Sequence, residues 1–170
     1  MRARIAENLG IALNEQDKSD EALYFYRIAE QIYRKIGDSL ALSHLYNNIA
    51  KVLAELGDEK SSNDYLWCAA LLAESYSGTK SPILPNIYLN IAQNALEAGK
   101  LDTAETYARK ALEAVRELHT PGVEAYIQVC LGDIYRRKGD LQAARAKLIP
   151  QLFPSQIASW RPAIPLFRFF

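Results

Sequence analysis

The chain lacks an excess of charge of either sign. Twenty lysine and arginine residues balance twenty aspartate and glutamate residues among 170 residues. A protein that holds nucleic acid normally carries a basic surface, so this balance argues against a nucleic-acid partner. Apolar residues make up 49% of the chain and charged residues 24%, which is typical of a folded protein rather than a disordered one.

Cysteine is also scarce, because the sequence contains only Cys68 and Cys130. Two isolated thiols form neither a disulfide framework nor a zinc site. The sequence shows no signal-peptide pattern at Met1 and no apolar run of transmembrane length. We therefore expect a cytoplasmic protein with no membrane partner.

Residue patterns that would indicate catalysis are missing. His44 and His119 have no partner at metal-ligand spacing. The stretch SGTKS at 77–81 lacks the upstream glycine and the preceding strand of a phosphate loop. Cys130 has no local base or oxyanion arrangement that would make it a nucleophile. The sequence thus predicts no enzyme, no metal site and no cofactor.

A repeated segment is present instead. The stretch LNIAQNALEAGKLDTAETYARKAL at 89–112 has relatives that begin at Asn8, Asn48 and Cys130. The copies align on four pairs spaced 40, 42 and 40 residues apart: Leu9-Gly10, Ile49-Ala50, Ile91-Ala92 and Leu131-Gly132. We assign a repeat array to residues 1–149, with repeats at approximately 3–38, 39–80, 81–120 and 121–149.

Each copy has the pattern of a helix, a tight turn and a second helix. Glycine supplies the turn in three copies, at Gly57-Asp58, Gly99-Lys100 and Gly139-Asp140, and Asp17-Lys18 replaces it in the first. Asp102 followed by Glu105 has the spacing of a capping box and predicts a helix start. Thr120-Pro121 predicts another, with proline at the first helical position. No segment shows sustained strand alternation.

Small residues recur in register along both halves of the repeat, where they would let two helix backbones approach closely. The positions are Gly10, Ala50, Ala92 and Gly132 in the first halves, and Ala22, Ser62, Ala104 and Ala144 in the second. Ala29, Ala69 and Ala111 follow one or two turns later. Helix propensity alone does not explain a recurrence in register, so we predict close packing between the two helices of each copy.

The shared pattern of the copies resembles the tetratricopeptide repeat. The pattern consists of Leu-Gly, an aromatic residue or leucine three positions later, a turn glycine, and then an alanine with a bulky residue four positions after it. The resemblance implies an all-α fold, a right-handed superhelical array of four αα-hairpins with about eight helices. The period exceeds the usual ~34 residues of that repeat and is similar to the repeats of kinesin light chains and peptide-sensing bacterial regulators. The family's loop proline is absent after the second helix of copy one, where Arg34 continues the helix.

An α-helix turns by ~100° per residue, which places Tyr88, Ile91 and Ala92 of the third copy on the face toward the core. The opposite face of this helix points outward. In the family that it resembles, this outward face lines a concave groove that binds extended peptides or protein segments. Carrying the register across the copies gives these candidate groove residues: Asn8, His44, Asn47, Asn48, Lys51, Asn86, Asn90, Gln93, Tyr126, Asp133 and Arg137.

Asn8, Asn48 and Asn90 occupy the same register in three successive copies. A carboxamide offers two donors and an acceptor, so a ladder of them could hold the main chain of a peptide whatever its sequence. Alternatively, the asparagines tie the groove helices to one another. The sequence leaves both interpretations open.

The leading functional hypothesis is a non-catalytic scaffold that binds a protein or peptide segment in the groove. The alternative is the ligand-sensing domain of a signalling or transcriptional regulator whose effector domain is absent from this chain. An effector domain encoded upstream in a longer natural gene would favour the ligand-sensing domain over the scaffold. An enzyme is the third hypothesis. Catalytic turnover that is abolished by one substitution of a polar groove residue would support it.

The end of the chain, residues 150–170, differs in composition from the array. It holds four of the seven prolines, four of the five phenylalanines and Trp160. Pro150 and Pro154 are expected to end the last helix early and leave an irregular tail. The tail could cover the last hairpin within one molecule or mediate self-association. It could also lie in a groove as a peptide mimic, or be an extension without a structural role.

Overall fold

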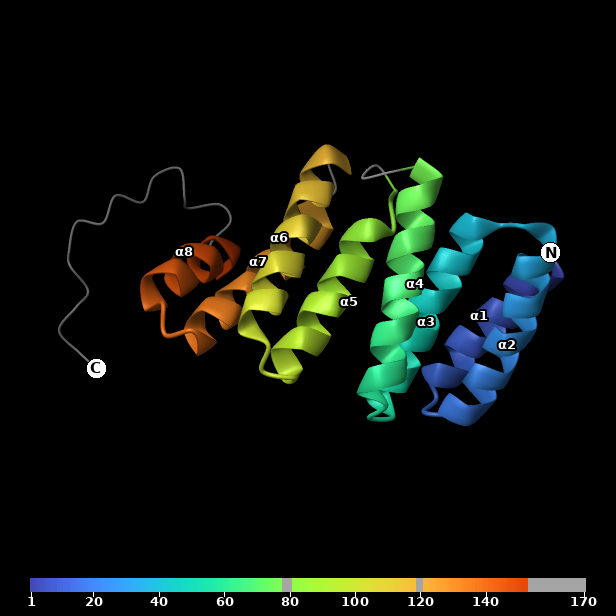
Figure 1. Cartoon of the computed structure of the whole chain (residues 1–170). Coiled ribbons are helices and arrows are strands. Elements are labelled where there is room, and N and C mark those ends of the chain that lie inside the picture. The colour runs from blue at the N-terminus through green and yellow to red at the C-terminus, as the bar shows by residue number, and fades with distance from the viewer. Residues whose placement is uncertain (78–80, 119–120, 153–170) are drawn as a thin grey trace.

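The computed structural model describes residues 1–77, 81–118 and 121–152, and all regular structure in these ranges is helical (Figure 1). Within these ranges, eight helices follow one another: α1 (Arg2–Asn14), α2 (Ser19–Ile36), α3 (Ser39–Glu55), α4 (Glu59–Ser77), α5 (Leu84–Glu97), α6 (Leu101–Leu118), α7 (Pro121–Arg137) and α8 (Leu141–Leu152). The predicted all-α class and helix count are confirmed, and α7 begins at Pro121 as expected.

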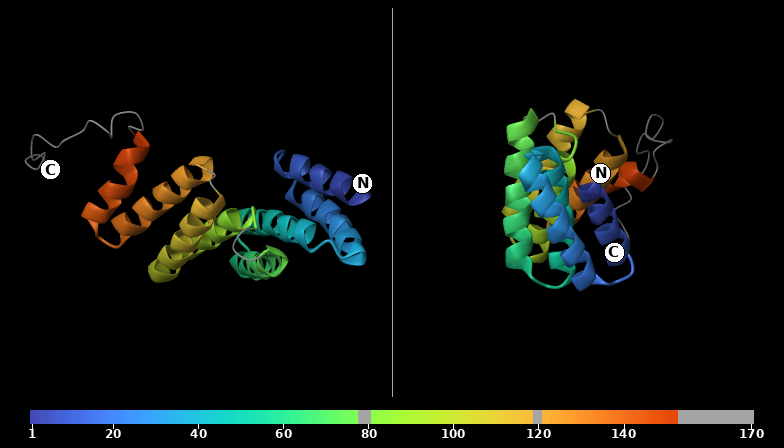
Figure 2. Two further views of the ribbon diagram at one scale, coloured as in Figure 1. Left: turned by 90° about the horizontal axis from the view of Figure 1, so that it is seen from above. Right: turned by 90° about the vertical axis from the view of Figure 1, so that its right-hand side faces the viewer.

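The helices form four antiparallel hairpins, α1–α2, α3–α4, α5–α6 and α7–α8, that stand in a row (Figure 1). Each hairpin packs on the next mainly through its second helix, since α2 contacts α3, α4 contacts α5 and α6 contacts α7. Seen from above, the row bends so that both ends rise toward the same side (Figure 2). This arrangement is the stacking of a helical repeat array.

All four hairpin turns use one hydrogen-bond pattern. The amide of the residue after the turn donates to a carbonyl five residues back, as in Lys18 to Leu13 and Lys100 to Ala95. This bond requires a residue with left-handed backbone conformation, which Gly57, Gly99 and Gly139 supply. In the first hairpin Asp17 has a φ of 59° and takes the place of glycine. The turn prediction is therefore confirmed in all four copies.

Aspartate side chains mark the start of three helices. Asp38, Asp58 and Asp140 each accept a hydrogen bond from the backbone amide three residues on, at 2.9–3.0 Å. Such a cap satisfies a donor that the first helical turn leaves unpaired. The predicted cap at Asp102 is wrong, because α6 already begins at Leu101. The Asp102 carboxylate binds the ammonium group of Lys138 at 2.6 Å instead.

The seam between the two helices of a hairpin sets a small residue against a larger one in the first and last hairpins. Gly10 faces Tyr26 and Gly132 faces Leu148, each pair sixteen residues apart. Ala50–Leu66 and Ala92–Ala108 have the same spacing. A Cβ atom added to Gly10 would lie 2.5 Å from the Tyr26 ring, and one added to Gly132 would lie 2.5 Å from Leu148. The small residues in register are buried in every copy, which confirms the predicted close packing.

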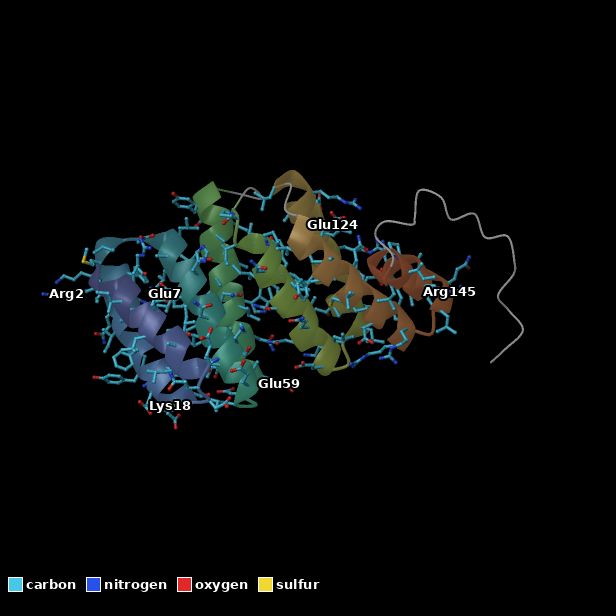
Figure 3. All side chains as sticks on the ribbon, turned by 180° about the vertical axis from the view of Figure 1, so that it is seen from behind. Arg2, Glu7, Lys18, Glu59, Glu124 and Arg145 are labelled. Carbon is cyan, nitrogen blue, oxygen red and sulfur yellow. The ribbon has the colours of Figure 1, made fainter. Side chains whose placement is uncertain are left out.

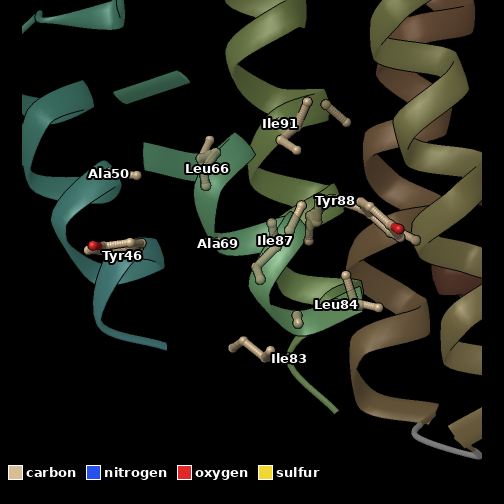
Figure 4. Close-up of a cluster of buried hydrophobic side chains, with 14 of the residues drawn as sticks. Tyr46, Ala50, Leu66, Ala69, Ile83, Leu84, Ile87, Tyr88 and Ile91 are labelled. Carbon is tan, nitrogen blue, oxygen red and sulfur yellow. The ribbon is translucent and has the colours of Figure 1, made fainter. Parts of the chain in front are cut away.

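The core continues from one hairpin to the next. In Figure 4, Leu66 and Ala69 of α4 lie between Ala50 of α3 and the Ile87 and Ile91 side chains of α5. Two buried serines stand among these apolar residues, and each donates to a carbonyl of the neighbouring helix: Ser43 to Ala69 at 2.9 Å and Ser62 to Ala50 at 2.8 Å. Because both hydroxyl groups are bonded, their burial carries no unpaired polar atom.

The last helix differs from expectation. Pro150 does not end α8, which continues through it to Leu152 and so enters the expected tail. Proline removes one backbone donor and bends a helix, but residues on either side of it can remain helical. With 12 residues, α8 is still shorter than the 18-residue α2 and α6. Residues 153–170, on which the expectations about the tail fall, lie outside the described part of the chain.

Candidate functional site

All eleven candidate groove residues lie on the first helices of the four hairpins, α1, α3, α5 and α7. Six are exposed: Asn8, Lys51, Asn86, Gln93, Tyr126 and Arg137. His44, Asn48, Asn90 and Asp133 are half-buried. Asn47 is only 7% exposed, so its side chain is not open to the groove as the register suggested.

Polar side chains connect α1 to α3. The Asn48 amide donates to Glu7 Oε1 at 3.4 Å, and Glu7 Oε2 accepts a shorter bond from the Tyr33 hydroxyl at 2.8 Å. Near the other end of α1, the Asn14 amide donates to Glu55 Oε2 at 3.0 Å. Glu7 thus links α1, α2 and α3.

The next pair of first helices, α3 and α5, is joined by two of the candidate residues themselves. The Asn90 amide donates to Asn47 Oδ1 at 2.8 Å. This bond explains why Asn47 tolerates burial, since a buried carboxamide needs a partner. It also occupies one of the two N–H donors of Asn90.

A third connection joins α5 to α7. The Arg137 guanidinium donates to the carbonyl oxygen of Leu96 at 3.1 Å. Asp133 holds the guanidinium in position, since its Oδ2 lies 3.1 Å from Arg137 Nε. Asp133 also accepts hydrogen bonds from Arg136, and these bonds foremost, together with the positive charges of Arg136 and Arg137, lower the pKa of its carboxyl. Arg137 therefore serves as a link between hairpins.

These connections bear on the two interpretations of the asparagine ladder. Asn48 and Asn90 each hydrogen-bond to the preceding first helix, which is the structural role that the sequence left open. Asn8 is exposed and forms no hydrogen bond to any described residue. Contact between Asn48 or Asn90 and the main chain of a ligand stays a prediction.

A pocket of about 240 Å³ opens between α3 and α5. Its floor consists of small and apolar residues of α3 and α4, including Ala50, Ala54 and Leu66. Its rim brings together three of the candidate residues, Lys51, Asn90 and Gln93, with three others that the candidate set omits, Glu55, Asn94 and Glu97. The sequence-based register therefore identified half of the polar rim.

The three omitted rim residues follow a simple spacing. Glu55 comes four residues after Lys51, Asn94 four after Asn90, and Glu97 four after Gln93. Residues at that spacing lie on one face of a helix, one turn apart. Extending the candidate face by one turn would have found them. Asn94 is fixed by bonds from its amide to Ser62 Oγ at 2.9 Å and Asn63 Oδ1 at 3.3 Å.

The other chemistry of the described residues is modest. Burial raises the pKa of the Cys130 thiol to about 11, so the thiol is protonated at neutral pH. Within residues 1–77, 81–118 and 121–152, no group of three His, Cys, Asp or Glu side chains could hold a metal ion. No helix in these ranges is both long and apolar enough to cross a bilayer.

Comparison with known proteins places this geometry in a family. Models of the tetratricopeptide repeat match residues 1–69 and 85–114. Among curated protein sequences, none matches the chain. Among solved structures, the chain superimposes with a TM-score of 0.82 on BtubC (BKLC) from P. vanneervenii, at 20% identity, over 99% of this chain and 69% of that one.

A second structure extends the comparison. The Rap conjugation gene regulator of the plasmid pLS20, solved in complex with the Phr* peptide, matches with a TM-score of 0.70 at 19% identity. The match covers 86% of this chain but only 40% of the regulator. The chain has small residues in register, a turn residue with left-handed backbone conformation in each hairpin, and four stacked hairpins. It belongs to the tetratricopeptide repeat family.

Proposed function

We propose that the chain is a scaffold that binds an extended peptide or protein segment along the face formed by α1, α3, α5 and α7. The pocket between α3 and α5 is the central contact of this proposal. The family to which the chain belongs is typically a non-catalytic interaction module, and the row of hairpins bends about one side (Figure 2). The face carries polar groups that no neighbouring helix uses.

The pocket is the observation that carries the proposal. Its volume of about 240 Å³ fits one side chain of a peptide better than a whole cofactor. The apolar floor would cover an aliphatic side-chain stem, while the rim offers an ammonium group, two carboxylates and three carboxamides. Lys51 and Gln93 form no hydrogen bond to any described residue, so both are available to a ligand.

The test begins with capture of the partner on the immobilised chain and continues with calorimetric titration of that partner. Lys51→Ala and Gln93→Ala should each weaken binding by about 0.5–1.5 kcal/mol, the loss expected for one hydrogen bond. Lys60→Ala and Gln31→Ala are matched controls, since both residues are exposed on second helices. Unchanged affinity in both groove variants would place the binding site elsewhere.

Asn48→Ala combined with Asn90→Ala tests the ladder itself. Both residues also connect first helices, so thermal stability must be measured on the same samples. Weaker binding at unchanged stability would support main-chain contact by the asparagines. Lower stability with unchanged affinity would assign them to the structural role.

The second candidate is a ligand-sensing domain. The Rap regulator, whose fold is similar, was solved with a bound peptide, and a row of hairpins can change its curvature when a ligand binds one face. Small-angle scattering with and without the captured partner separates the two candidates. A sensor should change its radius of gyration on binding, whereas a rigid scaffold should not.

Two further elements of the proposal have their own support. The free thiols Cys68 and Cys130 suit a reducing compartment such as the cytoplasm. The segment 153–170, rich in proline and aromatic residues, is proposed to cover apolar surface or to mediate self-association. Deletion of this segment should then change the molecular mass or the melting temperature, measured by light scattering and calorimetry.

A further inference from the structure

Helix α1 stands at one end of the row, and its outer face is apolar. Ile5 and Leu9 are 61% and 41% exposed, and Ala12 beside them is exposed as well. The spacings of four and three residues place all three on one side of the helix. Figures 1 and 2 show that α1 and α2 form one end of the row, with no further hairpin beyond them. Nothing in the described part of the chain therefore covers these side chains.

The same register positions are buried in the other three hairpins. Ile5 corresponds to Leu45, Ile87 and Ile127, all fully buried. Leu9 corresponds to Ile49, Ile91 and Leu131, which are at most 4% exposed.

Those counterparts are covered because α2, α4 and α6 pack against α3, α5 and α7. Helix α1 carries on this face the kind of side chains that the other hairpins bury against a neighbouring helix, so the face is suited to contact another helix.

The charges along α1 indicate which helix that is. Arg2 and Arg4 are exposed near its N-terminus. Glu15 and Asp17 are exposed at its other end, close to Asp20 and Glu21 at the start of α2. Figure 3 shows Arg2 at one end of α1 and Lys18 in the turn beyond the other end, where Lys18 is one basic residue among four acidic ones. An antiparallel copy of the same helix would place basic residues opposite acidic ones at both ends.

We infer that α1 is a homodimerisation surface, on which a second copy of this chain packs its own α1 in antiparallel orientation. Arg2, Ile5, Leu9 and Ala12 form a stripe along α1 with spacings of three, four and three residues, the seam of a two-helix contact, and Gln16 follows in the turn. With Leu9 at the two-fold axis, Ile5 of one copy lies beside Ala12 of the other. Arg2 then lies near Gln16 and Glu15, as a self-complementary interface requires.

This contact goes beyond the proposed function and is compatible with it. The candidate groove residue of α1, Asn8, lies outside the stripe, as does Glu7, which is bonded to α2 and α3. Two copies joined through α1 would form one longer row with both faces open to partners. The contact buries one helix per copy, which is a small interface, so we expect a dissociation constant in the micromolar range.

Sedimentation equilibrium on the full chain tests the inference. The chain should be dimeric at about 100 μM and dissociate on dilution. Leu9→Lys should raise the dissociation constant at least about tenfold, because it buries a charge at the axis without a partner. Leu71→Lys is the matched control, since Leu71 is equally apolar and 65% exposed but lies on α4. A monomer at that concentration, or equal effects of both substitutions, would overturn the inference.

Two further variants test the orientation. Arg2→Glu should weaken the dimer, and adding Glu15→Arg should restore it, because the exchanged charges again face each other. In a Cys68→Ser background, Leu9→Cys should form an interchain disulfide, whereas Ile5→Cys should not, because a disulfide requires Cα atoms within about 7 Å. Cross-linking at Ile5 without cross-linking at Leu9 would contradict the antiparallel arrangement.

Discussion

The seam inside each hairpin and the seam between hairpins are built differently. Inside a hairpin, small residues face larger ones, as Gly10 faces Tyr26, and the fit is steric. Between hairpins, a tyrosine hydroxyl donates to a glutamate of the preceding helix: Tyr46 to Glu30 at 2.9 Å, Tyr88 to Glu74 at 2.5 Å and Tyr135 to Glu105 at 3.0 Å. Steric fit dominates the glycine seams inside hairpins, while between hairpins these polar contacts add to the shared apolar core.

The contacts between hairpins also differ among themselves. In the first and third, an arginine four residues after the glutamate completes a triad, with Arg34 and Arg109 each donating to the tyrosine oxygen at 2.7 Å. In the middle contact, the residue four positions after Glu74 is Gly78, so no arginine stands there. The cation near Tyr88 is Lys110 of α6, within the same hairpin, at 5.8 Å from the ring centre.

The largest effect is expected from overfilling a seam inside a hairpin. Ala104 is fully buried where α6 crosses α5, so Ala104→Leu should lower the free energy of unfolding by about 1–3 kcal/mol. Glu113→Leu is the control, since Glu113 lies on the exposed side of the same helix and should change stability by no more than about 0.5 kcal/mol. Urea denaturation measures both. Equal stability of the two variants would contradict the steric description.

A smaller loss is expected from Gly10→Ala. Alanine favours a helix over glycine by about 1 kcal/mol, but the new Cβ would lie 2.5 Å from the Tyr26 ring. We expect the clash to prevail and the variant to lose about 1–2 kcal/mol.

Adding Tyr26→Leu to Gly10→Ala recreates the Ala50–Leu66 pair of the second hairpin and should recover most of this stability. The measurement is the double-mutant cycle of unfolding free energies. Additive effects of the two substitutions would show that the residues do not share one space.

The two kinds of seam explain what the sequence could predict. Backbone approach demands a small residue at one register position, so Ala50, Ala92 and Gly132 reveal the hairpins directly. The tyrosine contacts keep no common register. Tyr46 and Tyr88 lie four residues before the small residue, whereas Tyr135 lies three after it and Gln128 occupies the equivalent place. A long side chain can reach the same glutamate from several positions, so spacing alone does not reveal the contact.

The candidate site was predictable to a similar extent. The helical period placed all eleven candidates on first helices and included half of the polar residues that line the pocket. It did not show that Asn90 bonds to Asn47, since that depends on how closely two first helices approach. It also could not assign Asp17 a left-handed conformation or show that α8 continues past Pro150, because both depend on neighbouring packing that compensates a local cost.

A contact between hairpins should be worth less than a steric seam. Tyr46→Phe removes the hydroxyl that donates to Glu30 and accepts from Arg34, and should cost about 1 kcal/mol. Tyr24→Phe, at an exposed tyrosine of α2 with no hydrogen bond to a described residue, should cost nothing measurable. If the two variants melt at the same temperature, the hydroxyl triad does not contribute to stability.

The smallest effect concerns acid pH and the third contact between hairpins. Bonding to Lys138 foremost, and also to Arg109 and Tyr135, lowers the pKa of Glu105 from 4.5 to about 2. A lowered pKa means that the carboxylate contributes stability above pH 4.5 and loses that contribution as the pH falls toward 2. Because the Arg109 side chain is 63% exposed, solvent screens the pair, and we expect less than about 1 kcal/mol.

Glu105→Gln tests this assignment. The variant should be less stable than the original chain at pH 7, and the difference should shrink between pH 4.5 and 2, as followed by urea denaturation across that range. Glu113→Gln, at an exposed position on the same helix, serves as the comparison for a general charge effect. A difference that stays constant down to pH 2 would mean that the glutamine fails for reasons of packing and that the charge of Glu105 is not what joins α6 to α7.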